Sequence, residues 1–154
     1  MTTIFAFSDS HGAGINAEYI SLMGESDLIF YTGDGLANIL SDERIPKDKL
    51  YAVKGNCDGR LNFDDEKIVQ VEDVKFLITH GHIYSNNLDM VYSALEQKVD
   101  CVVFGHTHMF SDETCDGVRL INIGSTANSP LNHIGYTYIV VQGKNIFAKF
   151  VKMG

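Results

Sequence analysis

Aspartate, asparagine and histidine recur beside glycine in five short segments of this 154-residue chain. The segments are SDSHG at 8–12, GDG at 33–35, GNCD at 55–58, HGH at 80–82 and GHTH at 105–108. Carboxylate and amide oxygens together with imidazole nitrogens suit borderline divalent ions such as Mn²⁺, Fe²⁺, Co²⁺, Ni²⁺ or Zn²⁺ better than Ca²⁺. The five segments therefore predict a divalent-metal site, and such a site needs no thiolate ligand.

Two of the segments place ligand-type side chains two positions apart: Asp9 with His11, and His106 with His108. In an extended segment, residues i and i+2 point to the same side of the backbone. Each pair could then direct two side chains toward one place. A single pair of this kind is also typical of a turn or a solvated loop, but five such segments in order are hard to ascribe to coincidence.

Each segment closely follows a short apolar run that predicts a β-strand. These runs cover 3–7, 27–31, 50–53, 74–79 and 101–104. Ligands of open α/β sheets bind beyond the carboxyl ends of the strands, because loops and helix starts converge there. We therefore expect the polar residues of the five segments to meet, with the glycines allowing sharp turns and close approach.

Helical and strand-like periodicities predict the remaining elements. The first half alternates strands with helical windows at 15–23 and 36–40, an order that predicts a parallel βαβαβ unit. The second half is richer in antiparallel pairs. Its predicted elements are a strand at 67–71 in a hairpin with 74–79, a helix at 88–98, strands at 112–115 and 118–122 around the Asp116-Gly117 turn, and a terminal pair at 136–142 and 145–152. Together they predict a mixed α/β domain with two packed sheets and helices outside.

Length and composition limit the class of protein. A chain of 154 residues with 45% hydrophobic and 21% charged residues is typical of one globular domain, which we expect to span residues 1–154. No apolar run approaches the roughly 18 to 20 residues that cross a bilayer, and the N-terminus does not resemble a signal peptide. No membrane partner is expected.

The cysteines and the net charge add two further expectations. Cys57, Cys101 and Cys115 are odd in number and lack CxxC spacing, so neither a disulfide framework nor a zinc knuckle is predicted, and a cytoplasmic location is expected. A net charge of -8 disfavours long nucleic acids as partners. Any phosphate chemistry must therefore draw its positive charge from a local source.

In order, the five segments resemble the signature of the calcineurin-like metallophosphoesterase superfamily, D-x-H, G-D, G-N-x-[DE], H and G-H-x-H. The matching stretches are DSH at 9–11, GD at 33–34, GNCD at 55–58, THGH at 79–82 and GHTH at 105–108. The small size and the GNCD and THGH stretches resemble most closely the YfcE-like phosphodiesterase branch. The resemblance implies a four-layer αββα fold, in which two mixed β-sheets pack as a sandwich with helices on the outer faces.

The same resemblance implies a site that holds two divalent metal ions. Carried over by position, the ligands of the first ion are Asp9, His11, Asp34 and His108. Those of the second ion are Asp34, Asn56, His80 and His106, so that Asp34 bridges the two. Mn²⁺ is the expected metal, with Ni²⁺, Co²⁺, Fe²⁺ or Zn²⁺ as alternatives.

Two such ions would reconcile phosphate chemistry with an acidic chain. They bring four positive charges, Asp9 and Asp34 remove two and a bridging hydroxide removes one, which leaves about +1 at the site. In the implied mechanism the ions lower the pKa of the bridging water, and the hydroxide attacks phosphorus in line with the leaving oxygen. No covalent enzyme intermediate is required.

Three motif residues are candidate catalytic residues. Asn56 belongs to the implied ligand set, Asp58 is expected to hydrogen-bond a metal-bound water or a ligand histidine, and His82 is a candidate phosphate contact or general acid. The alternatives are that Asp58 is a plain turn residue and that His82 only packs against or caps the following segment. His133 is expected to be a loop residue.

Cys57 departs from the pattern of the larger phosphatases that resemble this family. They carry a histidine at this position, which is thought to assist the leaving group. A thiol is a poor proton donor to an alkoxide. We therefore expect either a preference for esters with good leaving groups or a protonating role for His82.

The complete ligand set on a small scaffold predicts a metal-dependent phosphodiesterase. Its expected substrate is a small phosphate ester, nucleotide-like esters included. One alternative is a phosphomonoesterase with the same site. Another is a catalytically weak binding scaffold, since members of this fold in the retromer coat act as binding modules. Association into a homo-oligomer is left open.

Overall fold

The computed structural model describes residues 1–129 and 133–153, which form two five-stranded sheets. The strands of the first sheet are β1 (Thr2–Phe7), β2 (Leu28–Tyr31), β3 (Leu50–Ala52), β9 (Gly135–Gln142) and β10 (Asn145–Lys152). Those of the second are β4 (Glu66–Val71), β5 (Val74–Thr79), β6 (Cys101–Phe104), β7 (Ser111–Cys115) and β8 (Val118–Asn122). The strand orders are β10-β9-β1-β2-β3 and β4-β5-β6-β8-β7.

Parallel pairing joins the strands that precede the polar segments. β2 is parallel to both β1 and β3, and β6 is parallel to both β5 and β8. The other pairs are antiparallel, and they include the hairpins β4–β5, β7–β8 and β9–β10. Both sheets are therefore mixed. The predicted βαβαβ unit and the three predicted antiparallel pairs are confirmed.

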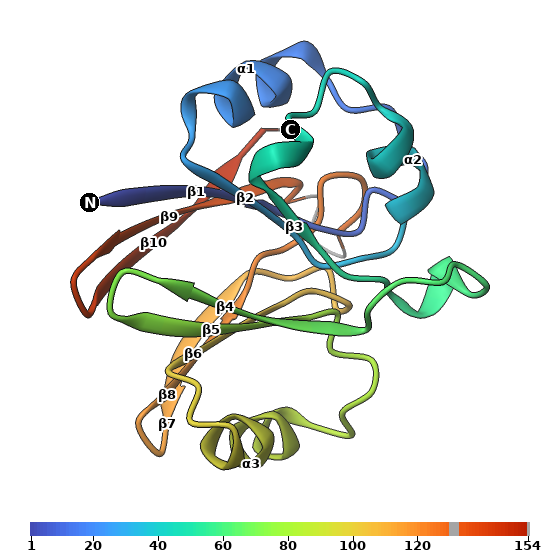
Figure 1. Ribbon diagram of the computed structural model, residues 1–154. Coiled ribbons are helices and arrows are strands. Elements are labelled where there is room, and N and C mark those ends of the chain that lie inside the picture. The colour runs from blue at the N-terminus through green and yellow to red at the C-terminus, as the bar shows by residue number, and fades with distance from the viewer. Residues whose placement is uncertain (130–132, 154) are drawn as a thin grey trace.

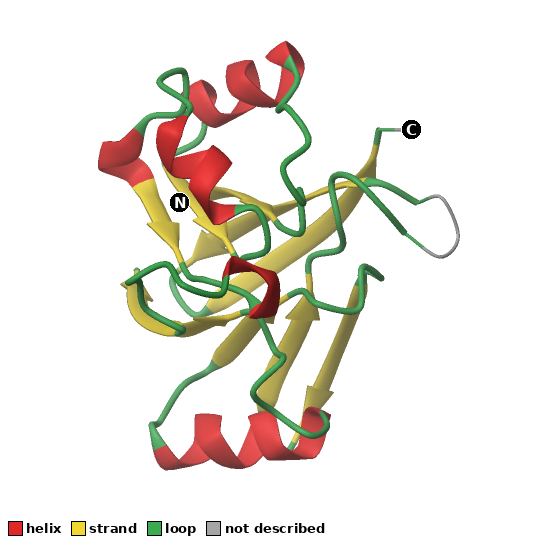
Figure 2. Cartoon of the chain, turned by 90° about the vertical axis from the view of Figure 1, so that its right-hand side faces the viewer, coloured by secondary structure: helices red, strands yellow, loops and turns green. Residues whose placement is uncertain are grey.

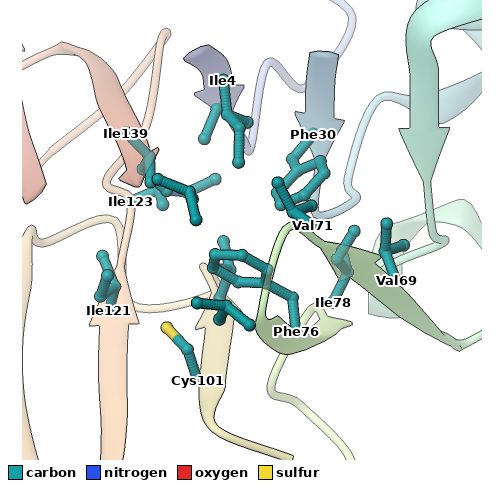
Figure 3. Close-up of a cluster of buried hydrophobic side chains, with 14 of the residues drawn as sticks. Ile4, Phe30, Val69, Val71, Phe76, Ile78, Cys101, Ile121, Ile123 and Ile139 are labelled. Atoms are coloured by element: carbon teal, nitrogen blue, oxygen red, sulfur yellow. The ribbon is translucent and has the colours of Figure 1, made fainter. Parts of the chain in front are cut away.

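Alternating side chains of the strands build the core between the sheets. In β1, Ile4 points between the two sheets, whereas its neighbour Phe5 points to the opposite face. Figure 3 shows the inter-sheet cluster, in which the rings of Phe30 and Phe76 lie 5.6 Å apart. Burying each such side chain stabilises the fold by about 1.5–3 kcal/mol. This packing fixes the two sheets, and with them the loops at the strand ends.

Helices cover the outer faces of both sheets. Helix α1 (Ala17–Glu25) and helix α2 (Leu36–Ser41) lie over the first sheet, and helix α3 (Asn87–Glu96) lies over the second (Figures 1 and 2). Tyr19 and Met23 of α1 pack in the apolar cluster that contains Phe5. The result is the predicted four-layer arrangement of helices, two sheets and helix.

Helix boundaries follow the capping residues. Asn16 accepts a hydrogen bond from the Tyr19 amide (2.9 Å), so α1 begins at Ala17 and not at the predicted residue 15. Two short 3-10 helices, Lys47–Lys49 and Asn56–Asp58, were not predicted. The second of them contains most of the GNCD segment. Among the described residues, no helix is long and apolar enough to cross a membrane.

Candidate metal centre

The loops that follow β1, β2, β5 and β6 meet where the two sheets adjoin. The Asp9 amide donates to the Gly33 carbonyl (3.0 Å), the His106 amide donates to the Asp9 carboxylate (3.1 Å), and the Gly105 amide donates to the His80 carbonyl (3.1 Å). These loops bring together six predicted ligands, which we call the strand-end cluster: Asp9, His11, Asp34, His80, His106 and His108.

Most cluster residues adopt a left-handed backbone, which corrects one step of the sequence argument. Asp9, His11, Asp34, His106 and His108 have φ between 48° and 71°. Each such residue costs about 1–2 kcal/mol relative to a right-handed conformation. Strain of this kind collects at functional sites. The prediction that these pairs are extended is therefore wrong. Asp9 and His11 still point to one place, with Asp9 Oδ1 3.6 Å from His11 Nε2, whereas His106 and His108 do not.

His106 and His108 consequently point to different neighbours. His106 Nδ1 lies 3.2 Å from His80 Nε2, whereas His108 Nε2 lies 3.1 Å from His11 Nε2. Ring contacts follow the same division, with His106 against His80 and His108 against His11. The GHTH segment thus contributes one imidazole to each end of the strand-end cluster.

Asp9 is the most deeply buried carboxylate of the cluster. Its Oδ2 accepts hydrogen bonds from Ser8 Oγ (2.6 Å) and from the His106 amide. Its Oδ1 is buried and lacks a hydrogen-bond partner among the described residues. That oxygen faces His108 Nε2 at 3.2 Å and His11 Nε2 at 3.6 Å. A buried carboxylate oxygen without a donor costs about 1–3 kcal/mol or more, so this position favours a cation.

His80 is held so that one ring nitrogen faces the carboxylates. Its Nδ1 lies 2.8 Å from the Thr32 carbonyl oxygen, and because a carbonyl only accepts, Nδ1 carries the hydrogen. This leaves Nε2 as the nitrogen that would turn a lone pair toward Asp34 Oδ2 (3.2 Å) and Asp9 Oδ1 (3.7 Å). Two lone-pair-bearing groups at this separation suit a shared metal ion.

The strand-end cluster fits divalent cations. Asp9, His11 and His108 form one group of facing ligand atoms, and Asp9, Asp34 and His80 form another, with all atoms of a group within 4.8 Å of one another. Burial, together with the nearby His80, lowers the pKa of His106, which keeps its ring neutral and able to ligate. Carboxylate and imidazole donors are the set that borderline divalent ions prefer.

Two glycines allow the loops to close around the carboxylates. A Cβ added to Gly55 would lie 2.2 Å from Asp34 Oδ1, and one added to Gly105 would lie 2.6 Å from Asp9 Oδ2. A side chain at either position would displace the carboxylate. The close approach expected of the motif glycines is thus seen at these two positions.

Asp58 hydrogen-bonds backbone amides and not a ligand histidine, which was one of its expected partners. Its carboxylate accepts hydrogen bonds from four backbone amides, those of Asp34 (2.8 Å), Gly35 (2.8 Å), Leu36 (3.0 Å) and Gly55 (2.8 Å). Burial opposes ionisation, but the four donors outweigh it and lower the pKa of Asp58. Asp58 therefore ties the loop that carries Asp34 to the GNCD segment, which makes it a positioning residue.

Asn56 and His82 lie beside the cluster. Exposed Asn56 directs its Nδ2 at Cys57 Sγ (3.6 Å), and its role as a ligand stays a prediction. The His82 ring lies 5.3 Å from that of His80. Burial and the nearby His80 lower the pKa of His82, which disfavours protonation near neutral pH. A general-acid role is thus weakened, while a phosphate contact stays a prediction. His133 is exposed in a loop, as expected.

Sequence reasoning missed the residues that orient the ligands. The Ser8 hydroxyl donates to the Asp9 carboxylate, and the Thr32 carbonyl accepts from the His80 ring. The Tyr31 hydroxyl donates to the Asp34 carbonyl (2.6 Å). Each is an ordinary residue at a strand end, without a spacing that would single it out. Cys57, which sequence reasoning related only to the leaving group, also has its Sγ within 4.8 Å of ligand atoms of His11 and Asp34.

Two cavities adjoin the strand-end cluster. One of about 330 Å³ is lined by His11, Cys57, Asp58, Asn38 and Leu61, among others. The other, of about 230 Å³, adjoins His106 and is lined by Tyr84, the amide side chains of Asn86 and Asn87, and apolar Met90 and Phe104. A larger cavity of about 500 Å³ includes Asp73, Arg119 and Lys144 but no cluster residue, so its size does not make it the reactive site.

Known proteins share both sequence and fold with this chain. Residues 2–145 match the calcineurin-like phosphoesterase superfamily domain. The probable metallophosphoesterase YsnB of Bacillus subtilis is 35% identical over 128 residues, covering 79% of this chain and 73% of the relative.

Two solved structures have the same fold at lower identity. A novel archaeal phosphodiesterase superposes with a TM-score of 0.77 at 24% identity, covering 97% of this chain and 99% of the other. Wild-type Vps29 of Entamoeba histolytica in complex with Zn²⁺ superposes with a TM-score of 0.73 at 18% identity, covering 97% and 98%. Both share the arrangement of two mixed sheets with few helices.

Proposed function

This chain belongs to the calcineurin-like phosphoesterase superfamily, and on that premise we propose that it is a phosphodiesterase acting on small diesters at a dinuclear metal centre. The buried Asp/His cluster carries this proposal. In this cluster, the unpaired Asp9 Oδ1 and His80 Nε2 converge from separate loops. These polar atoms add nothing to the apolar packing of the core.

The proposed ligands divide between two ions that share Asp34. Asp9, His11, Asp34 and His108 would hold the first, and Asp34, Asn56, His80 and His106 would hold the second. When bound, the two ions would lower the pKa of a water nucleophile and offset the charge of the phosphoryl group. Asp34 has one oxygen on the Cys57 amide (2.8 Å) and the other facing His80, an orientation suited to the shared position.

Positioning by the protein supports the chemistry at this centre. Asp58 fixes the backbone of the loop that carries Asp34, the Cys57 amide holds Asp34 Oδ1, and Thr32 fixes the ring of His80. Ligand atoms that are already in place do not have to be ordered when the substrate arrives. The acidic chain supports small substrates over long nucleic acids, because its net charge of -8 repels an extended phosphate backbone.

Charge supports a diester over a monoester. In the part of the chain that the structure describes, neither cavity beside the cluster is lined by lysine or arginine. A monoester carries nearly two negative charges at neutral pH, because its second pKa is about 6, whereas a diester carries one. The two cavities, one beside His11 and one beside His106, leave room for a substituent at each end of the strand-end cluster. Cys57, a poor proton donor, favours diesters with good leaving groups, and the archaeal relative in fold is named a phosphodiesterase.

The test compares matched substrates on one preparation. Protein loaded with Mn²⁺ should hydrolyse bis-p-nitrophenyl phosphate with a higher kcat/KM than p-nitrophenyl phosphate. Asp34→Asn should lower both rates by at least about 100-fold, since even partners outside the ligand set cost about 10–100-fold. A preference for the monoester would favour a phosphomonoesterase. Absence of bound metal after loading, with no hydrolysis of either ester, would favour a binding scaffold.

A further inference from the structure

A thiol lies at the open side of the strand-end cluster. Cys57 Sγ, His11 Nε2 or Nδ1 and an Asp34 carboxylate oxygen form a third group of potential ligand atoms, all within 4.8 Å of one another. Cys57 is exposed, whereas Cys101 is buried in the inter-sheet core. The position of Cys57 is therefore not explained by packing.

The backbone around Cys57 is held against the cluster. Its amide donates to Asp34 Oδ1 (2.8 Å), and the Asp58 carboxylate ties the same segment to the Asp34 loop through Gly55 and Asp34 amides. The sulfur can therefore not swing away with its loop unless these hydrogen bonds break. Among the described residues, the hydrogen-bond partner of the Cys57 sulfur is Asn56 Nδ2, at 3.6 Å.

An independent observation shows that a cation is favoured beside this group. Asp9 Oδ1 is fully buried and unpartnered among the described residues, and it faces His11 Nε2 at 3.6 Å. A cation drawn to that oxygen would lie next to His11, which belongs to the thiol-containing group as well. The thiol and the unpaired carboxylate oxygen thus face the same imidazole.

We propose that Cys57 is an additional, thiolate ligand of the metal held by His11 and Asp34 when that metal is thiophilic. This inference rests on the proposed function, because it concerns the first ion of the same centre. As the sulfur–metal bond forms, the thiol proton passes to solvent. Soft ligands select Zn²⁺, Cd²⁺ or Co²⁺ over Mn²⁺ or Mg²⁺. The centre would then hold thiophilic ions through Cys57 and hold Mn²⁺ without it.

Cobalt provides a readout that is separate from activity. Metal-free protein titrated with Co²⁺ should develop two kinds of absorption band. Visible d–d bands report that cobalt is bound, and a near-ultraviolet charge-transfer band reports a bond from sulfur to cobalt. Cys57→Ser should lose the charge-transfer band and keep the d–d bands. Cys115→Ser is the matched control, because its sulfur lies in β7 outside the three ligand groups, and it should keep both.

Metal competition gives a second measurement. Cys57→Ser should weaken Cd²⁺ binding by at least about tenfold, since loss of even an outer partner costs about 10–100-fold, and should leave Mn²⁺ affinity unchanged. Cobalt binding without a charge-transfer band in the wild type, or a band that survives in Cys57→Ser, overturns this inference and leaves the proposed function standing. Failure of the wild type to bind cobalt at all overturns both.

Discussion

The buried residues of the inter-sheet core and those of the strand-end cluster differ in how their groups are satisfied. Ile4 of β1 and Asp9 just beyond it are both fully buried. Ile4 meets apolar neighbours from both sheets, whereas one Asp9 oxygen meets no donor among the described residues. The core therefore stabilises the fold without a ligand, while the cluster costs stability until a cation compensates it.

Backbone conformation differs between the same two regions. The strands that form the core have regular pairing, and all cluster residues beyond them except His80 have positive φ. Regular pairing fixes the strand ends, which in turn hold the strained turns in place. The comparison predicts that substitutions in the core change stability with or without metal, and that substitutions in the cluster change metal binding first.

The largest effect is expected in the core. Phe76→Ala should lower the free energy of unfolding by about 3–5 kcal/mol, because it removes a buried ring from between the sheets. Phe147→Ala is the control, since Phe147 is 61% exposed and the expected change is within about 0.5 kcal/mol. Urea unfolding with chelator measures both. If both variants lost a similar free energy of unfolding, the stabilising role assigned to the inter-sheet core would be contradicted.

A smaller effect is expected on metal affinity, and it should differ between the two ends of the strand-end cluster. His108→Ala should weaken the first metal, beside His11, and His106→Ala the second, beside His80, each by at least about 100-fold, or about 2.7 kcal/mol. Calorimetric titration with Mn²⁺ should show one site lost in each variant. His133→Ala, in an exposed loop, is the control. Loss of the same site in both variants would contradict the division.

Asp58 tests whether positioning alone matters. Asp58→Ala removes the acceptor of four backbone amides and should lower metal affinity by about 10–100-fold while leaving all proposed ligands present. Asp65→Ala removes a nearby exposed carboxylate and should leave metal affinity unchanged. If Asp58→Ala binds metal normally but loses turnover, the side chain contacts substrate instead.

The smallest expected effect is a gain, not a loss, in the stability of the metal-free protein. Asp9→Asn should stabilise the metal-free protein by about 1 kcal/mol, because it removes a buried, partly unpaired charge while its amide oxygen still accepts from Ser8 and the His106 amide. The same variant should lose the stabilisation that added Mn²⁺ confers. Thermal unfolding with and without metal measures both. A less stable metal-free variant would show that Asp9 is paired in the absence of metal.

Local patterns in the sequence predicted most of the elements and the residues of the cluster. The alternation of apolar residues located the strands, and the polar residues beside glycine located their ends. Both signals are short-range, since they depend on side-chain direction along a few residues. The 3-10 helix over Asn56–Asp58 carries no such periodicity, and it was missed.

The sequence by itself therefore determined which side chains could bind metal and which strand each one follows. The resemblance assigned His106 and His108 to different ions, and only the tertiary structure decided which neighbours they contact, that Asp58 binds backbone amides, and that Cys57 faces His11. Each of these depends on a left-handed turn or on contacts between loops far apart in the chain. Spacing along the sequence does not encode those contacts, because they arise when the two sheets pack and bring the strand ends together.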